Sequence, residues 1–94
     1  MATHSAATAV HATLVATVVD TVTITSQSSE LVIYNRSSLS DLYFRVDGTN
    51  PQIAGDDSHI VPINSNRRIG PPDPINIQVK LISVGTPPYS VEVA

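Results

Sequence analysis

Apolar and polar residues alternate with a period of two in two stretches of this chain, residues 42–47 and 75–81. Such alternation is typical of β-strands that place one face in a core and the other in solvent or against a partner. The predicted core positions in these strands are Leu42, Phe44, Val46, Ile75, Ile77, Val79 and Leu81. The pattern therefore predicts an all-β protein built on half-buried strands.

A β-hairpin is predicted across residues 30–47. Its first strand is the run Leu31 to Arg36, which is rich in β-branched and aromatic residues, and its second strand is the alternating run 42–47. The break between them, residues 36–40, contains no Asn-Gly or Asp-Gly pair. We therefore expect a connection longer than a two-residue turn.

Turn residues interrupt the remaining sequence at short, regular intervals. Clusters such as Asp47-Gly48-Thr49-Asn50-Pro51 separate short apolar runs, Asp20 is expected near a turn, and Pro62 favours an edge strand. This spacing predicts a small β-sandwich or jelly-roll-like barrel of about seven or eight short antiparallel strands. The length of 94 residues suits one domain. We expect residues 1–9 to form an extended, flexible N-terminal arm and residues 10–94 to form a single β-sandwich domain.

Charge is scarce in this chain, at 14% of residues, and the net charge is -3. A nucleic-acid partner would call for a basic stripe, so none is expected. The chain has no cysteine, and no apolar run reaches the length of a membrane span. The Ala-rich start lacks a basic segment, so we expect no signal peptide. Exposed positions rich in Ser, Thr and Asn suit packing against another protein.

No residue pattern predicts catalysis, a metal or a cofactor. Asp47, Asn50, Asp56 and Asp57 supply oxygen atoms that suit calcium, but their spacing matches no EF-hand and these residue types are common in turns. The three histidines, at positions 4, 11 and 59, are too scattered for a zinc site. No serine lies in a nucleophile-elbow glycine pattern. We expect a protein that is not an enzyme.

The N-terminal residues are candidates for attachment to a partner. Residues 1–15 are poor in large apolar groups but rich in Thr, Val and Ala, which suit an added strand on a neighbour's sheet edge. On this hypothesis Val10, Leu14 and Val15 fill shallow apolar depressions on a neighbouring protein or a sister subunit. In the alternative, residues 10–19 are the first strand of the domain's own sheet.

Further candidate contact residues come from the body of the chain. Arg67 and Arg68 form the one basic cluster, which is either a solvated turn or an ion-pair site for an acidic partner. Tyr43 and Arg45 lie on the outward side of their strand and are candidates for a partner-binding face. Tyr34 and Tyr43 suit stacking on a sugar, and cross-strand packing explains them equally well.

Three stretches resemble small β-rich virion proteins of tailed bacteriophages, especially those of actinobacteria. The stretches are VIYNRSS, LYFRVDGTNPQIAGDDSHIVP and VKLISVGTPPYSVE, which together run from Val32 to Glu92. The resemblance implies a capsid decoration or accessory head protein, bound to the major capsid protein on the virion surface as a homo-oligomer and made in the host cytoplasm. It brings no catalytic residues. The alternatives are a head–tail or tail component, or a carbohydrate-binding, host-adhesion module on the virion.

Overall fold

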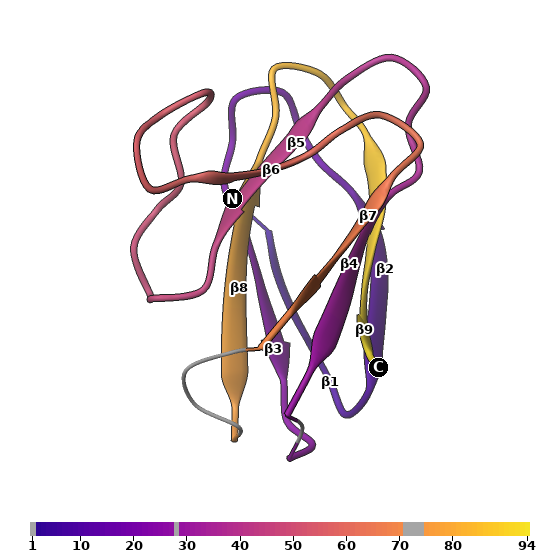
Figure 1. Ribbon diagram of the computed structural model, residues 1–94, viewed down its shortest axis with the longest axis vertical. Helices are drawn as coiled ribbons and strands as arrows, with labels where there is room; N and C mark the ends of the chain where they lie inside the picture. Colours follow the sequence, from indigo (N-terminus) through magenta and orange to yellow (C-terminus); the bar gives the residue numbers. More distant parts are fainter. Residues whose placement is uncertain (1, 28, 71–74) are drawn as a thin grey trace.

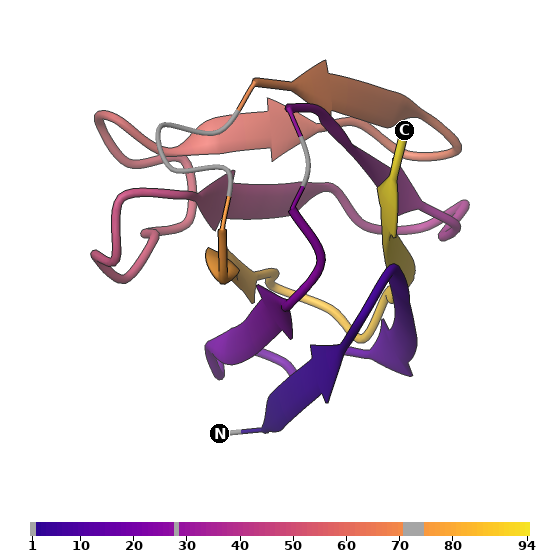
Figure 2. The ribbon, with the colours of Figure 1, turned by 90° about the horizontal axis from the view of Figure 1, so that it is seen from below.

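Two packed β-sheets form the protein (Figures 1 and 2). The computed structural model describes residues 2–27, 29–70 and 75–94. Within these ranges the strands are β1 (Thr3–Ala6), β2 (Ala9–Thr13), β3 (Asp20–Ile24), β4 (Leu31–Asn35), β5 (Leu42–Arg45), β6 (His59–Val61), β7 (Asn66–Ile69), β8 (Ile77–Ile82) and β9 (Pro88–Val93). The predicted all-β sandwich is confirmed. It has nine described strands, and it is not a closed barrel.

The strand order is that of a jelly roll with one additional strand. One sheet has the order β1-β3-β8-β5-β6, and the other has the order β2-β9-β4-β7. Strands β2 to β5 pair in reverse order with β9 to β6, as β2 with β9, β3 with β8, β4 with β7 and β5 with β6. The chain therefore folds as one long antiparallel hairpin wrapped into two sheets, which is the jelly-roll path. Strand β1 stands outside this scheme and pairs in parallel with β3.

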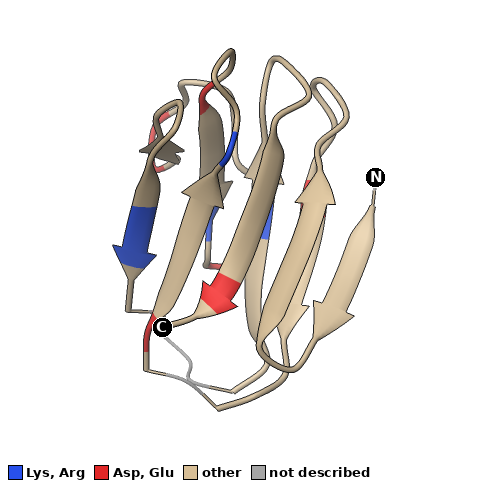
Figure 3. Ribbon diagram, turned by 90° about the vertical axis from the view of Figure 1, so that its right-hand side faces the viewer, with Lys and Arg blue, Asp and Glu red and all other residues tan. Residues whose placement is uncertain are grey.

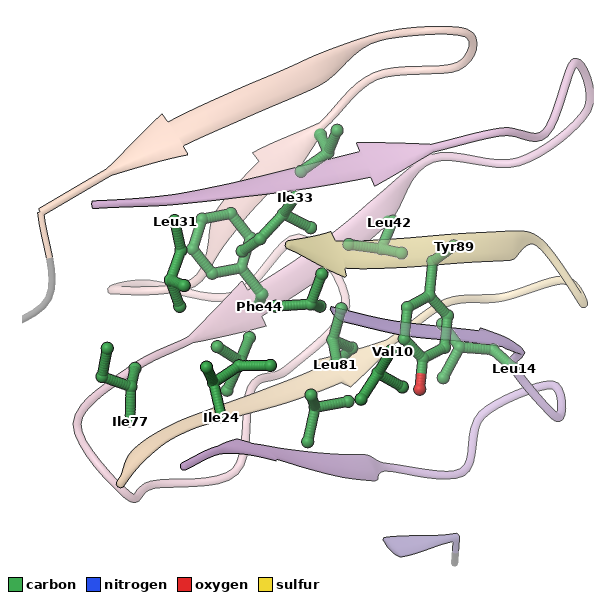
Figure 4. Close-up of a cluster of buried hydrophobic side chains, with 14 residues drawn as sticks. Val10, Leu14, Ile24, Leu31, Ile33, Leu42, Phe44, Ile77, Leu81 and Tyr89 are labelled. Atoms are coloured by element: carbon green, nitrogen blue, oxygen red, sulfur yellow. The ribbon is translucent and has the colours of Figure 1, made fainter. Parts of the chain in front are cut away.

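The core lies between the sheets and consists mainly of aliphatic side chains (Figure 4). Phe44 and Tyr89 are its two largest members, and both are fully buried. Of the predicted core positions, Leu42, Phe44, Ile77, Val79 and Leu81 are buried, and Val46 packs against the core while partly exposed. The prediction that Ile75 is a core residue is wrong, because Ile75 precedes β8 and is 52% exposed.

The predicted hairpin of residues 30–47 is also wrong. Strand β4 pairs with β7 and β9 in the four-stranded sheet, and β5 pairs with β6 and β8 in the five-stranded sheet. The connection 36–41 thus crosses from one sheet to the other. Alternation identifies the side of a strand that faces the core, but either sheet of a sandwich satisfies it. The prediction that Pro62 marks an edge strand is confirmed. Strand β6 ends at Val61, directly before Pro62, and lies at the edge of the five-stranded sheet.

The structure corrects the predicted N-terminal arm for residues 2–9. Thr3–Ala6 pairs with β3 in one sheet, and Ala9–Thr13 pairs with β9 in the other. The alternative, in which residues 10–19 start the domain's own sheet, is closer, although the strand ends at Thr13. Asp20 does not lie in a turn. It begins β3 and is buried, where its Oδ2 accepts a hydrogen bond of 3.0 Å from the Tyr89 hydroxyl.

Candidate partner-binding surface

The predicted contact residues Val10 and Leu14 belong to the protein's own core. Val10 is 7% exposed and Leu14 is 1% exposed, and both join the cluster between the sheets (Figure 4). They cannot fill depressions on a partner while the sandwich is intact, so this part of the attachment hypothesis is wrong. Val15, the next residue, is 59% exposed in the connection between β2 and β3.

Tyr43 and Arg45 lie on the outer face of the five-stranded sheet, as alternation predicted. Tyr43 stands opposite Ile82 on one side and Ile60 on the other. Arg45 forms an ion pair with Asp47, so its charge is already matched within the chain. The Arg45 guanidinium and the Thr49 amide lower the pKa of Asp47 to about 2. This face therefore combines apolar residues around Tyr43 with a charge at Arg45 that is paired within the chain.

Arg67 and Arg68 do not form one basic cluster. They are neighbours in β7, so their side chains leave opposite faces of the strand. The Arg67 guanidinium lies 6.0 Å from the centroid of the Phe44 ring, at the limit of a cation–π contact. The Arg68 Nε lies 3.3 Å from the Glu30 Oε1. Each arginine has a partner inside the molecule.

The acidic connection between β5 and β6, residues 46–58, is organised as turns. The Asp47 carboxylate accepts hydrogen bonds from Arg45 and from the Thr49 amide, and Lys80 Nζ lies 3.4 Å from Asn50 Oδ1. No group of three acidic or histidine side chains suitable for a metal occurs among the described residues. The described surface also has no pocket, and no described helix could cross a membrane.

The three histidines lie apart, as their spacing predicted. His4 is in β1, and His11 in β2 has its Nδ1 2.7 Å from the Ser90 hydroxyl. His59 in β6 lies against the Phe44 ring, with the two ring centroids 5.3 Å apart. Each histidine therefore has a different neighbour, and they do not share a site.

Four connections meet at one end of the sandwich, at the top of Figure 1. They are residues 14–19, 36–41, 62–65 and 83–87, and we call them the loop end. The jelly-roll path requires this, because connections that leave alternate strands emerge at the same end. Each connection carries one exposed large aliphatic residue, and these are Val15 at 59%, Leu39 at 90%, Ile63 at 44% and Val84 at 60%. The loop end contains two charged residues, Arg36 and Asp41.

Both charged groups of the loop end are engaged with the backbone. Arg36 Nη2 donates to the Tyr89 carbonyl at 3.2 Å, and Asp41 Oδ1 accepts from the Ile63 amide at 3.2 Å. In Figure 3, most of the ribbon at this end is tan, the colour of residues other than Lys, Arg, Asp and Glu. A surface with four separate aliphatic side chains and only two charged residues is suited to contact with another apolar surface.

Hydrogen bonds join each of the four loops to a neighbouring loop. The Thr17 amide donates to the Ser83 carbonyl at 2.8 Å, and the Ser83 hydroxyl donates to the Asp41 carbonyl at 2.6 Å. The Asn64 amide then donates to the Ser37 carbonyl at 2.9 Å. These bonds run from the first loop through the fourth and second to the third. The loop end is consequently one connected surface.

Leu39 is held outward by a buried polar network beneath it. Asn35 is 2% exposed, and its Nδ2 donates to the carbonyls of Ser40 and Val61 at 2.8 and 3.0 Å. Its Oδ1 accepts from the Ser37 amide, and the Ser37 hydroxyl accepts from the amides of Leu39 and Ser40. This network fixes the turn that presents Leu39, so the exposed leucine is a built feature of the surface.

Of the four exposed aliphatic residues of the loop end, Val15 alone was predicted as a contact. A single aliphatic residue among small polar ones, as in Ser38-Leu39-Ser40, was the available signal. Only the topology brings the four positions together. No known family, curated protein or solved structure matches this chain.

Proposed function

We propose that this protein is a non-enzymatic virion structural protein, a decoration or accessory protein that binds the assembled capsid through its loop end. The observation that carries the proposal is the connected surface, poor in charge, with Val15, Leu39, Ile63 and Val84 exposed. The resemblance to phage virion proteins supplies the partner, the major capsid protein. The jelly-roll path supports it too, because viral capsid proteins use this architecture.

The expected strength of this contact follows from the area that docking would remove from water. Full burial of one Val, Leu or Ile side chain contributes about 1.5–3 kcal/mol. Ordering and desolvation costs offset part of the sum. Several copies acting together on a repeating shell convert a modest single contact into stable attachment. Because the loop end carries one positive and one negative group, whose charges sum to zero, we expect attachment to change little with salt concentration.

Co-sedimentation of the protein with emptied capsids tests the proposal. Leu39→Ser and Val84→Ser remove aliphatic groups from the loop end. Ile75→Ser is the matched control, because Ile75 is 52% exposed outside the loop end. We expect Leu39→Ser to weaken binding at least about ten-fold, equivalent to about 1.4 kcal/mol, with an unchanged melting temperature. Wild-type binding by both loop-end variants would overturn the proposed surface, and no binding by the wild-type protein would overturn the capsid as partner.

A head–tail or tail location is tested in the same assay. The same loop end would serve for attachment there, since its chemistry is not specific to the head. Purified tails and emptied heads, offered separately, distinguish the two. Binding to heads supports decoration, and binding to tails alone supports the alternative.

A second candidate function, carbohydrate binding, rests on a different face. The strand registers place His11, Ser90, Tyr34 and Asn66 in one cross-strand row on the outer face of the four-stranded sheet. An aromatic ring beside hydroxyl, imidazole and amide groups suits sugar recognition. A glycan array with the isolated protein tests it. Binding that Tyr34→Ala abolishes would favour a host-adhesion module, and absence of binding would remove this alternative.

A further inference from the structure

Strand β1 is not needed to complete the jelly roll. The pairs β2 with β9, β3 with β8, β4 with β7 and β5 with β6 already account for all eight strands of that architecture. Strand β1 adds a ninth strand at the edge of one sheet, beside β3, and lies at the margin of the molecule in Figure 2. An accessory edge strand of this kind can leave while the main strand pairing stays complete.

The contact between β1 and the body relies on the backbone. The Thr21 and Thr25 amides donate to the carbonyls of Ala2 and Ala6, each at 2.9 Å. The strand contains no large apolar residue, and Ala6 is its one side chain packed against the core. Strand β1 is thus held mainly by backbone hydrogen bonds. The β1 strand of a second copy of the chain can form the same bonds.

The side-chain contact beneath β1 is incomplete. His4 Nε2 lies 3.7 Å from the Oδ2 of buried Asp20, beyond hydrogen-bond distance. His4 Nε2 and Asp20 Oδ1 are buried atoms without a hydrogen-bond partner, and Tyr89 is the other titratable group at this carboxyl. The two-residue hinge Ala7-Thr8 ties β1 to β2 in the opposite sheet. The Ala7 and Thr8 carbonyls accept from Ser26 and Val93, so the hinge itself is anchored.

We propose that β1 is exchanged reciprocally between two copies of this chain, so that β1 of each copy pairs with β3 of the other. Short hinges favour such exchange, because opening them allows the same strand pairing without the tight turn. An exchanged β1 is not tied by the Ala7-Thr8 link to the copy with which it pairs. Its His4 can therefore come within hydrogen-bond distance of Asp20 of that copy. Residues 1–19 contain no Lys, Arg, Asp or Glu, so no charge repulsion opposes the approach of two such edges.

Disulfide trapping with separate single-cysteine chains tests the exchange directly. Ser5 and Thr23 are register partners in β1 and β3, and the native chain has no cysteine. We expect a mixture of Ser5→Cys and Thr23→Cys chains, refolded together and oxidised, to form a disulfide between unlike chains. Gln78→Cys replaces Thr23→Cys in the control, because Gln78 lies one strand further away, opposite Thr23 in β8. That separation from position 5, about 10 Å, is too long for a disulfide.

Light scattering supplies the second measurement. We expect a mass twice that of the 10.0 kDa chain at high concentration. Insertion of three glycines between Ala7 and Thr8 should return the mass to that of a monomer, because a longer link favours pairing of β1 with its own β3 over exchange. The proposal is overturned if the Ser5–Thr23 mixture cross-links no more than the control, or if the longer hinge leaves a dimer intact. Neither measurement depends on capsid binding.

Discussion

The loop end and the β5–β6 connection are both built from small polar residues, Gly and Pro, yet they are held in different ways. In the β5–β6 connection, most bonds stay within the segment. The Gly55 amide donates to the Gln52 carbonyl, and the Ser58 amide donates to the Gly55 carbonyl. The Thr49 amide donates to the Asp47 carboxylate. At the loop end, the bonds run from one loop to another. The first arrangement makes a self-contained projection, and the second makes a continuous surface.

The two regions also treat their apolar residues differently. In the β5–β6 connection Pro51 is buried and Ile53 is half-buried, whereas polar and acidic groups take the exposed positions. At the loop end one aliphatic residue in each connection is exposed, although Leu14 is buried, and the buried positions beneath Leu39 hold Asn35 and Ser37. The Asn35 side chain stabilises the turn and at the same time keeps Leu39 in solvent. This contrast supports the proposal that the loop end is a contact surface.

Phe44→Ala should have the largest effect, because β5 joins the two regions. The loop 36–41 enters this strand, the connection 46–58 leaves it, and the Phe44 ring is fully buried. The expected loss is about 3–5 kcal/mol of unfolding free energy. Urea unfolding measures it, with Phe44→Leu as the milder control. A loss below about 1 kcal/mol would contradict the packing described here.

Asn35→Ala should affect the loop end alone. The change leaves the Ser40 and Val61 carbonyls and the Ser37 amide without their side-chain partner. Each buried group left unpaired costs about 1–3 kcal/mol, and we expect a net loss of about 3 kcal/mol because water reaches some of them. Hydrogen exchange should rise at Ser37, Leu39 and Ser40 and stay unchanged at Thr49. Equal increases in both regions would mean that the network does not hold Leu39 in place.

Asp47→Asn should have the smallest effect, confined to the β5–β6 connection and lost in acid. The pKa of Asp47 in the folded protein is about 2, below its ordinary value of 3.8. The ionised carboxylate therefore stabilises the fold above pH 4, and this contribution disappears as the pH falls through 2. The difference in urea midpoint between wild type and variant should shrink over that range. A difference that grows on acidification would contradict the Arg45–Asp47 pair.

The sequence predicted which face of each strand is buried better than it predicted which strands pair. Alternation correctly placed Leu42, Phe44 and Val79 inside, because it depends on one strand at a time. The pairing of β4 with β5 failed because six intervening residues allow either a hairpin or a crossing between sheets. Strand β1 was missed because backbone pairing alone holds it, and backbone pairing leaves no apolar signal in a sequence such as Thr3 to Ala6.

The candidate surface was harder to predict for a physical reason. Val15, Leu39, Ile63 and Val84 are far apart in the chain, and each looks like an ordinary loop residue in its own segment. Exposure becomes visible only after the core has been assigned to other residues. The prediction that Arg67 and Arg68 act together failed because a strand separates neighbouring side chains onto opposite faces.

Electron cryo-microscopy of emptied capsids mixed with the protein tests most directly whether the loop end is the docking surface. The map should show the sandwich standing on its loop end, with Leu39 buried against the capsid protein and residues 46–58 in solvent. The density should be unchanged for Asp47→Asn and weak for Leu39→Ser at the same protein concentration. Density that places residues 46–58 or the outer face of either sheet against the shell, with Leu39 in solvent, would contradict the account.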